Sequence, residues 1–216
     1  MLTTHLPFTF GALRLHRVDF DPATLQPADL LWLPHHAQLA DCGRKRQAEH
    51  LAGRIAAVHA LREVGEKQVP LPGAQGQPLW PAPWYGSISH CERTAIAAVA
   101  PYPLGVDIER LFTPALAAEL CSSVVNASEQ RLLKQSALPF AHALTLAFSA
   151  KESAFKAFST YSNGFPGFHS ATLVAIDDLS VRLRFSADFS PTRAGDLLAV
   201  EGRFLDQYLI TCTRPQ

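Results

Sequence analysis

The sequence predicts an α+β fold, because two long segments with helical periodicity each accompany several shorter segments with strand periodicity. The helical segments are residues 44–64 and 142–158. The order helix, strands, helix, strands suggests two comparable halves, although no residue-level repeat is visible. We expect one structural unit, residues 1–216, with an N-terminal lobe of about 1–103 and a C-terminal lobe of about 104–216.

In the N-terminal half, the strongest signal is the helix at 44–64. Its apolar side chains recur at helical spacing, and Gly65 stands where a glycine commonly ends a helix. Residues 1–36 show weak signals that indicate short strands and loops. The proline- and glycine-rich segment 66–85 indicates a long irregular loop. Two strands joined by a hairpin turn are expected next, at 86–90 and 95–100.

The C-terminal half is expected to begin with a strand at 104–109. Two short helices should follow at 114–121 and 128–136, the second capped by Ser128 or by Asn126 just before it. After the long helix at 142–158, Gly164 should break the chain. Alternating patterns then predict antiparallel strands at 171–176, 181–186, 197–204 and 207–212.

The composition argues against several classes of function. The formal net charge is zero, so no global field attracts nucleic acid, and 48% of the residues are apolar, which is enough for a core. The four cysteines lie far apart, which argues against a zinc site or a disulfide framework. No signal-peptide pattern opens the chain, and no apolar run reaches the roughly 18 residues that a membrane span needs. We expect a cytoplasmic protein without a transmembrane segment.

The first segment that carries chemistry is GVDIE at 105–109. Side chains alternate between the faces of a strand, so Asp107 and Glu109 should point to the same side. Neighbouring carboxylates repel unless a cation lies between them, and such hard oxygen ligands suit Mg²⁺. By itself, such a pair is more typical of an exposed strand face with solvated acids.

The second segment is KESAFK at 151–156, in the second long helix. Ser149, Glu152 and Lys156 share one helix face, so Glu152 can be a third metal ligand and Lys156 a phosphate contact. The alternative is an ordinary surface pair of Glu152 and Lys156. Lys151 lies at the edge of the apolar stripe, where a cation needs an anionic partner or must reach water.

The third group of candidates lies in the N-terminal half. Arg46 and Arg54 are eight positions apart and about 80° apart around the helix, so both can bind one phosphate. A solvated basic helix start is the alternative. Ser89 and His90 end a predicted strand, and the histidine there can donate to a phosphate or serve a structural role. No GxSxG elbow supports a hydrolase.

Together, these segments resemble a known family. GVDIE at 105–109 followed by FSAKESAFK at 148–156 resembles the paired signature of the 4′-phosphopantetheinyl transferase superfamily, GxDxE and (W/F)xxKExxxK. RKRQAEHLAGR at 44–54 and GSISH at 86–90 resemble the siderophore-type branch. Two departures are visible: the signature begins with Phe148 rather than tryptophan, and the loop at 72–75 lacks the lysine of some relatives.

The resemblance implies a pseudo-two-fold α+β fold with coenzyme A in the cleft between the lobes. It implies Mg²⁺ on the diphosphate, held by Asp107, Glu109 and Glu152. The other contacts it implies are with the 3′-phosphate through Arg46 and Arg54, with the nucleotide and diphosphate through Ser89 and His90, and with phosphates through Lys151 and Lys156.

The implied reaction transfers the phosphopantetheine group of coenzyme A to a serine of a carrier protein and releases 3′,5′-ADP. The expected partners are apo aryl- and peptidyl-carrier domains of siderophore synthetases, and the enzyme is expected to be a monomer. Glu152 can act as the base, and Lys156 can stabilise the leaving phosphate. Two alternatives stay open: a binding protein without catalysis, and a transferase for fatty-acid or polyketide carriers. Peripheral membrane association with a synthetase complex also stays open.

Overall fold

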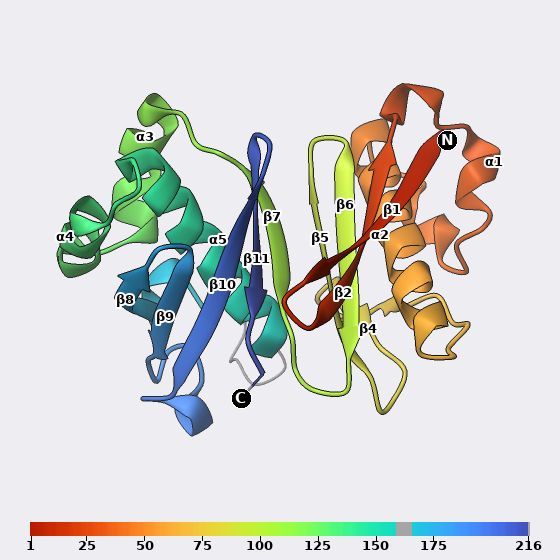
Figure 1. Cartoon of the computed structure of the whole chain (residues 1–216). Helices are drawn as coiled ribbons and strands as arrows, with labels where there is room; N and C mark the ends of the chain where they lie inside the picture. Colours follow the sequence, from red (N-terminus) through yellow and green to blue (C-terminus); the bar gives the residue numbers. More distant parts are fainter. Residues whose placement is uncertain (159–165, 216) are drawn as a thin grey trace. The chain divides into compact units, whose positions relative to one another are not determined.

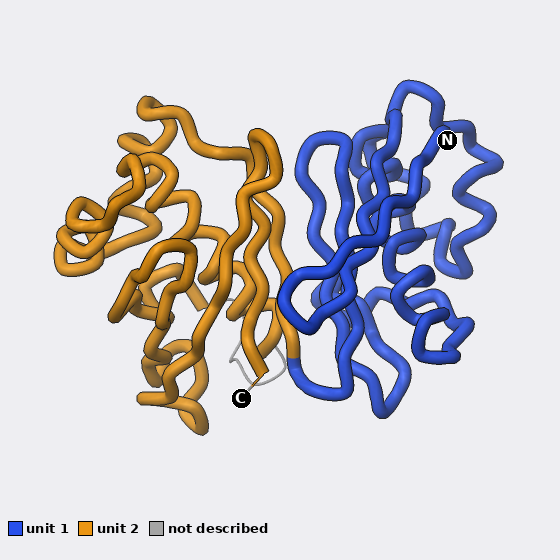
Figure 2. The backbone as a smooth tube through the Cα atoms, viewed as in Figure 1, with its two compact units in different colours: residues 1–103 blue, residues 104–216 orange. Residues whose placement is uncertain are grey.

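The computed structural model describes residues 1–158 and 166–215, and its elements are labelled in Figure 1. The chain divides into two compact units, unit 1 at Met1–Pro103 and unit 2 at Leu104–Gln216 (Figure 2). Each unit pairs a long helix with an antiparallel sheet, so the predicted α+β class is confirmed. The chain break expected at Gly164 lies outside the described residues.

Unit 1 is built on a four-stranded antiparallel sheet with the strand order β1-β2-β6-β5. Helix α2, Arg44–Glu63, packs on this sheet and buries alanine and leucine side chains against it. The helix ends at Gly65, which has a φ of +85° and donates its N–H to the carbonyl of Arg62. The strands are β1 Thr3–Phe10, β2 Leu13–Phe20, β5 Tyr85–Cys91 and β6 Thr94–Ala100.

The N-terminal segment is more regular than its sequence indicates. Strands β1 and β2 form a hairpin whose register runs from Thr3 opposite Phe20 to Phe10 opposite Leu13. Strand β1 is an edge strand and largely exposed, and its place at the edge tolerates Pro7. Short strands were expected in this segment without bounds, and the two observed strands have 8 residues each.

The smaller elements of unit 1 connect this sheet and helix. Helix α1 spans Pro27–Leu30, and short 3₁₀ turns lie at Pro22–Thr24 and His36–Leu39. The segment expected to be an irregular loop also contains one small hairpin, β3 Leu71–Pro72 and β4 Pro78–Leu79.

Unit 2 is built on a five-stranded antiparallel sheet with the order β7-β11-β10-β9-β8. Helix α5, Phe140–Phe158, packs on β7, β10 and β11, and its buried alanine, leucine and phenylalanine side chains form much of the core. Helices α3, Pro114–Val124, and α4, Ala127–Gln135, also pack on α5. The strands are β7 Val106–Arg110, β8 Ala171–Asp177, β9 Ser180–Phe185, β10 Leu197–Leu205 and β11 Tyr208–Thr213.

Helix α4 begins with a capping box. Asn126, one of the two predicted caps, accepts hydrogen bonds from the N–H groups of Ser128 and Glu129 at 2.9 and 3.0 Å. The Glu129 carboxylate accepts in return from the Asn126 N–H at 2.8 Å. This exchange fixes the start of α4 and holds the Glu129 side chain in the interior of unit 2.

Candidate active site

The strand β7 passes unusually close to helix α5 at Gly105. A Cβ atom added there would lie 1.8 Å from the carbonyl oxygen of Ser153, so no larger residue fits without moving the strand or the helix. The Gly105 N–H donates to the Oγ1 of Thr213 at 2.9 Å. The glycine of the GVDIE segment thus brings the acids that follow it against α5.

Asp107 is the centre of the polar contacts between β7 and α5. Its side chain is buried, with 1% relative exposure. One oxygen, Oδ2, accepts from the Ser149 hydroxyl at 2.7 Å, and the other, Oδ1, lies 2.5 Å from the Lys156 ammonium. A buried carboxylate needs both an opposite charge and hydrogen bonds, and Asp107 has both. The structure therefore brings together Asp107, Ser149 and Lys156, and the last two share one face of α5 as their spacing indicates.

A network of hydroxyl groups connects α5 to β11. Ser149 Oγ lies 2.8 Å from Thr211 Oγ1 on β11, and Ser153 Oγ lies 2.7 Å from the same atom. The Thr211 hydroxyl donates to the Ser149 carbonyl at 2.9 Å. All three side chains are fully buried. These contacts anchor one side of α5 to β7 and β11.

The remaining two acids, Glu109 and Glu152, lie within electrostatic range of Asp107 and Lys156. Burial raises the pKa of Glu109 to about 8, and the negative charges of Asp107 and Glu152 add to this while Lys156 opposes it. Burial also raises the pKa of Glu152, where Lys156 lowers and Asp107 raises it. Three carboxyl groups and one ammonium group therefore share this region, and repulsion between the ionised carboxylates adds to burial in favouring the protonated form of Glu109.

The donor set of these acids fits a hard divalent cation such as Mg²⁺, which favours carboxylate oxygens and would relieve this repulsion. Among residues 1–158 and 166–215, no group of three or more His, Cys, Asp or Glu side chains is arranged as a ready metal cage. Oδ1 of Asp107 already forms an ion pair with the ammonium group of Lys156.

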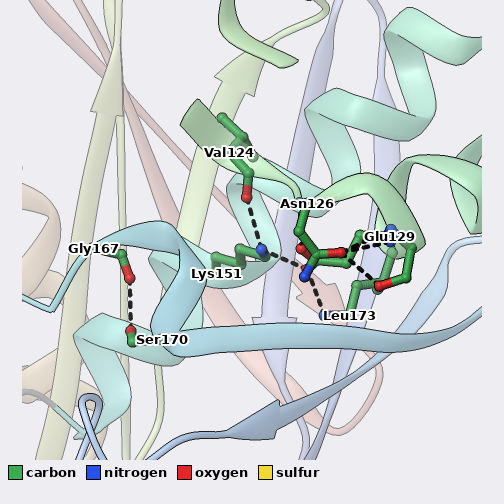
Figure 3. A network of polar contacts seen from close by, with 8 residues as sticks. Val124, Asn126, Glu129, Lys151, Gly167, Ser170 and Leu173 are labelled. Carbon is green, nitrogen blue, oxygen red and sulfur yellow. Dashed lines mark hydrogen bonds and ion pairs between the residues drawn. The ribbon is translucent and has the colours of Figure 1, made fainter. Parts of the chain in front are cut away.

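Lys151 is placed differently from the phosphate contact that the resemblance implies. Its ammonium is enclosed in the interior of unit 2 and forms an ion pair with Glu129 at 2.7 Å. It also donates to the carbonyl of Val124 at 2.8 Å (Figure 3). The sequence argument that a cation at this position needs an anionic partner is confirmed. Since the ammonium is committed to buried protein groups, we assign it no phosphate contact.

The other group of candidate residues lies in unit 1. Arg54 on α2 is buried, with 4% relative exposure, and its Nε and Nη2 atoms are buried without a hydrogen-bond partner among the described residues. Burial lowers the pKa of Arg54 to about 10, and the positive charge of Arg46 contributes, so the two guanidinium groups are close. Unsatisfied buried donors are costly, and a bound anion would satisfy them.

Histidines surround this arginine pair. His50 and His35 are in contact through their Nε2 atoms at 2.7 Å. Burial lowers the pKa of His50 to about 3, and the charges of Arg54, His35, Arg46 and His90 contribute. Ser89 on β5 is buried, and His90, beside it, is half-buried with Nδ1 3.9 Å from a Glu49 oxygen. Arg46, Arg54 and His90 therefore belong to one basic region of unit 1.

Sequence reasoning missed several residues of both groups. His35 lies in no motif, and His50 lies within the RKRQAEHLAGR segment but was not identified as a candidate. Glu129 could have been found, because Asn126 and Glu129 have the spacing of a capping box. Thr211 lies in a strand far along the chain from α5, and only the pairing of β11 with β7 brings it to Ser149.

Comparison with known proteins identifies the family of this chain. The sequence profile of the 4′-phosphopantetheinyl transferase N-terminal domain matches residues 35–100, and that of the 4′-phosphopantetheinyl transferase superfamily matches residues 103–213. The chain therefore belongs to the 4′-phosphopantetheinyl transferase superfamily. It is an enzyme of that class, which transfers phosphopantetheine from its substrate coenzyme A to a carrier-protein serine.

Similar proteins share most of this chain. Enterobactin synthase component D of Salmonella typhimurium is 49% identical over 98% of this chain and 90% of its own length. Enterobactin synthase component D of Escherichia coli strain K12 is 57% identical over 73% of this chain and 76% of its own length. The 4′-phosphopantetheinyl transferase Npt of Nocardia iowensis is 32% identical over 88% of this chain and 95% of its own length.

Across the described part of the chain, no helix combines the length and the apolar character that crossing a membrane requires.

Proposed function

We propose that this transferase acts on apo aryl- and peptidyl-carrier domains of a synthetase that makes an enterobactin-like siderophore, with Mg²⁺ as its cofactor. The observation that supports the metal requirement is the grouping of three carboxyl groups, Asp107, Glu109 and Glu152, where burial and the charges of the other two acids raise the pKa of Glu109 to about 8. The siderophore assignment rests on relatives named enterobactin synthase component D.

Coenzyme A is bound through its phosphates in this proposal. Arg54 offers two buried nitrogen atoms without a hydrogen-bond partner, which suits a phosphate held by charge-assisted hydrogen bonds. Arg46 lies near it, and together they bind the 3′-phosphate of the adenosine. Ser89 and His90 line the nucleotide and diphosphate. The partial burial of this basic region strengthens each contact relative to water.

The reaction is a displacement at the β-phosphate of coenzyme A. The carrier serine oxygen forms the new bond to phosphorus while the bond to the 3′,5′-ADP oxygen breaks. Glu152 accepts the serine proton, directly or through water, because burial raises its pKa and makes it a stronger base. Lys156 stabilises the leaving phosphate. Bound Mg²⁺, held by Asp107, Glu109 and Glu152, would supply further neutralisation of the diphosphate charge.

Asp107 and Ser149 act as support in this scheme. The Ser149 hydroxyl holds one oxygen of Asp107, and Lys156 contacts the other, so the carboxylate is fixed before substrate arrives. Fixed charges need little rearrangement during the reaction, which is the main source of electrostatic catalysis. A binding protein that had lost catalysis would not need this arrangement, and both Glu152 and Lys156 are present.

A panel of carriers tests the substrate assignment. The transferase is assayed with purified apo aryl-carrier, peptidyl-carrier, fatty-acid acyl-carrier and polyketide acyl-carrier domains, and kcat/KM is compared. We expect the siderophore carriers to be modified with the highest kcat/KM. A preference for a fatty-acid or polyketide carrier would replace the siderophore assignment with that alternative. We expect a monomeric cytoplasmic enzyme, which sedimentation and cell fractionation would test.

A further inference from the structure

A buried ion pair in unit 2 joins Lys151 of α5 to Glu129 of α4. Both side chains are almost completely enclosed, with 2% and 0% relative exposure. Lys151 Nζ lies 2.7 Å from Glu129 Oε1 and donates to the Val124 carbonyl at 2.8 Å (Figure 3). Burying two charges is expensive, and the further hydrogen bonds of each group offset only part of this cost. A buried pair of this kind is therefore weak evidence of a contribution to stability, and another role has to be considered.

The pair connects four separate segments of unit 2. Glu129 Oε1 also accepts from the Leu173 N–H on β8 at 2.7 Å, and Oε2 accepts from the Asn126 N–H at the start of α4. The Val124 carbonyl lies at the end of α3. Lys151 therefore ties α5 to the end of α3, the start of α4 and the edge strand β8.

The position of Lys151 on α5 determines what this tie controls. In a helix, Glu152 lies about 100° from Lys151 on one side, and about 60° from Ser149 and about 100° from Ser153 on the other. Ser149 and Ser153 are held by Thr211 and, for Ser149, by Asp107. Glu152 is thus on the part of the helix surface between two anchored sides.

We propose that the Lys151–Glu129 pair is a positioning element, which holds the rotation of α5 so that Glu152 faces Asp107 and Lys156. Lys151 is a positioning residue here and touches neither substrate nor metal. The proposal rests on the proposed function, because it takes Glu152 to be the base and a metal ligand. If the tie is removed, α5 keeps only the serine anchors on one side, and Glu152 can rotate away from the other acids.

Two variants test this role. Lys151→Met removes the ammonium but keeps an unbranched apolar chain. Glu129→Gln keeps the side-chain volume and an acceptor oxygen for the Leu173 N–H, and serves where Lys151→Met does not fold. The double variant Lys151→Met/Glu129→Gln buries no charge and separates positioning from stability. Lys134→Met is the control, because Lys134 is an exposed lysine of the same unit.

Four quantities are measured for each variant: kcat, the KM for coenzyme A, the melting temperature, and Mn²⁺ affinity by electron paramagnetic resonance without coenzyme A. We expect kcat to fall at least tenfold and Mn²⁺ binding to weaken at least threefold. The KM for coenzyme A should change less than twofold, because Arg54 is in the other unit. The double variant should regain melting temperature but not kcat or Mn²⁺ affinity.

If the double variant regains kcat and Mn²⁺ affinity together with its melting temperature, the role of the pair is purely structural. That result would overturn the proposal. Wild-type kcat and Mn²⁺ affinity in any folded single variant would do the same. A different result would contradict the proposed function, namely that the wild-type protein modifies no carrier. In that case the Mn²⁺ measurement still decides whether the pair positions the acids.

Discussion

The Lys156 ammonium lies 2.5 Å from Oδ1 of Asp107, and the two residues come from different elements, helix α5 and strand β7. Asp107 is buried and Lys156 is only half-buried, so the ion pair has one end in the interior and one end towards solvent. Ser149 contacts one oxygen of this carboxylate and Lys156 contacts the other. The carboxylate is therefore held at a fixed position between β7 and α5.

Asp107→Asn tests the importance of that charge. The variant keeps the shape of the side chain and can still bond Ser149, but it removes a negative charge from the acid group. We expect the unit to stay folded and kcat to fall by roughly 100-fold or more. Asp177→Asn is the control, because it removes an exposed acid of the same unit. Turnover and Mg²⁺ dependence like those of the wild type would show that Asp107 holds neither the metal nor Lys156 for catalysis.

Arg54→Met tests the phosphate site in unit 1. The variant should bind coenzyme A more weakly by about 1.5–3 kcal/mol, or roughly 10- to 100-fold, while binding of 3′-dephospho-coenzyme A changes little. Calorimetric titration of both ligands measures the difference. Arg62→Met is the matched control, since Arg62 is an exposed arginine of the same helix.

Arg54→Met also tests a prediction about stability. Arg54 buries two donor atoms without a partner in the ligand-free protein, so replacing it with methionine should not lower the melting temperature. Coenzyme A should then stabilise the wild type against heat more than it stabilises the variant. Equal losses of affinity for the two ligands would show that Arg54 does not contact the 3′-phosphate.

Gly105→Ala tests the close approach of β7 to α5. A Cβ atom would lie 1.8 Å from the Ser153 carbonyl oxygen, which is backbone and cannot move alone. We expect the unfolding free energy to fall by about 3 kcal/mol or more. Gly167→Ala serves as the control, because a Cβ there would meet no atom within 4 Å. Similar unfolding curves for the two variants would contradict the close approach.

The histidines of unit 1 make its stability sensitive to acid. The pKa of His50 falls from 6.5 to about 3 on folding, so below pH 6.5 the unfolded chain takes up a proton that the folded chain resists. Stability present above pH 6.5 should therefore be lost as the pH falls towards 3. Urea unfolding between about pH 7 and pH 4.5 should show this decline, and His50→Gln should reduce its slope. Equal slopes would assign the acid sensitivity to other groups.

Much of the fold could be predicted from local sequence patterns. The helix at 44–64 and the strands of unit 2 have strong periodicity, and their observed bounds, such as Arg44–Glu63, lie close to the predicted ones. The bounds of the strand Thr3–Phe10 were not predicted, because this exposed edge strand contains Pro7 and buries only Phe10, so its signal is weak. It pairs along its whole length with Leu13–Phe20.

The site was predictable where residues share one element. Ser149 and Lys156 lie on one helix face as their spacing indicates, whereas their contacts with Asp107 appear only in the structure. Contacts between distant segments were not predictable, because periodicity gives no information about partners in space. Lys151 is the example: the sequence showed that its charge needed a partner, but only the packing of α4 on α5 identifies Glu129.

The most direct test of the central claim is the mass of an apo aryl-carrier domain after incubation with this protein, coenzyme A and Mg²⁺. We predict that the carrier gains one phosphopantetheine group on its serine, with one equivalent of 3′,5′-ADP released. Omitting Mg²⁺ with a chelator present should prevent the change. An unmodified carrier under conditions in which a known transferase modifies the same preparation would contradict the account.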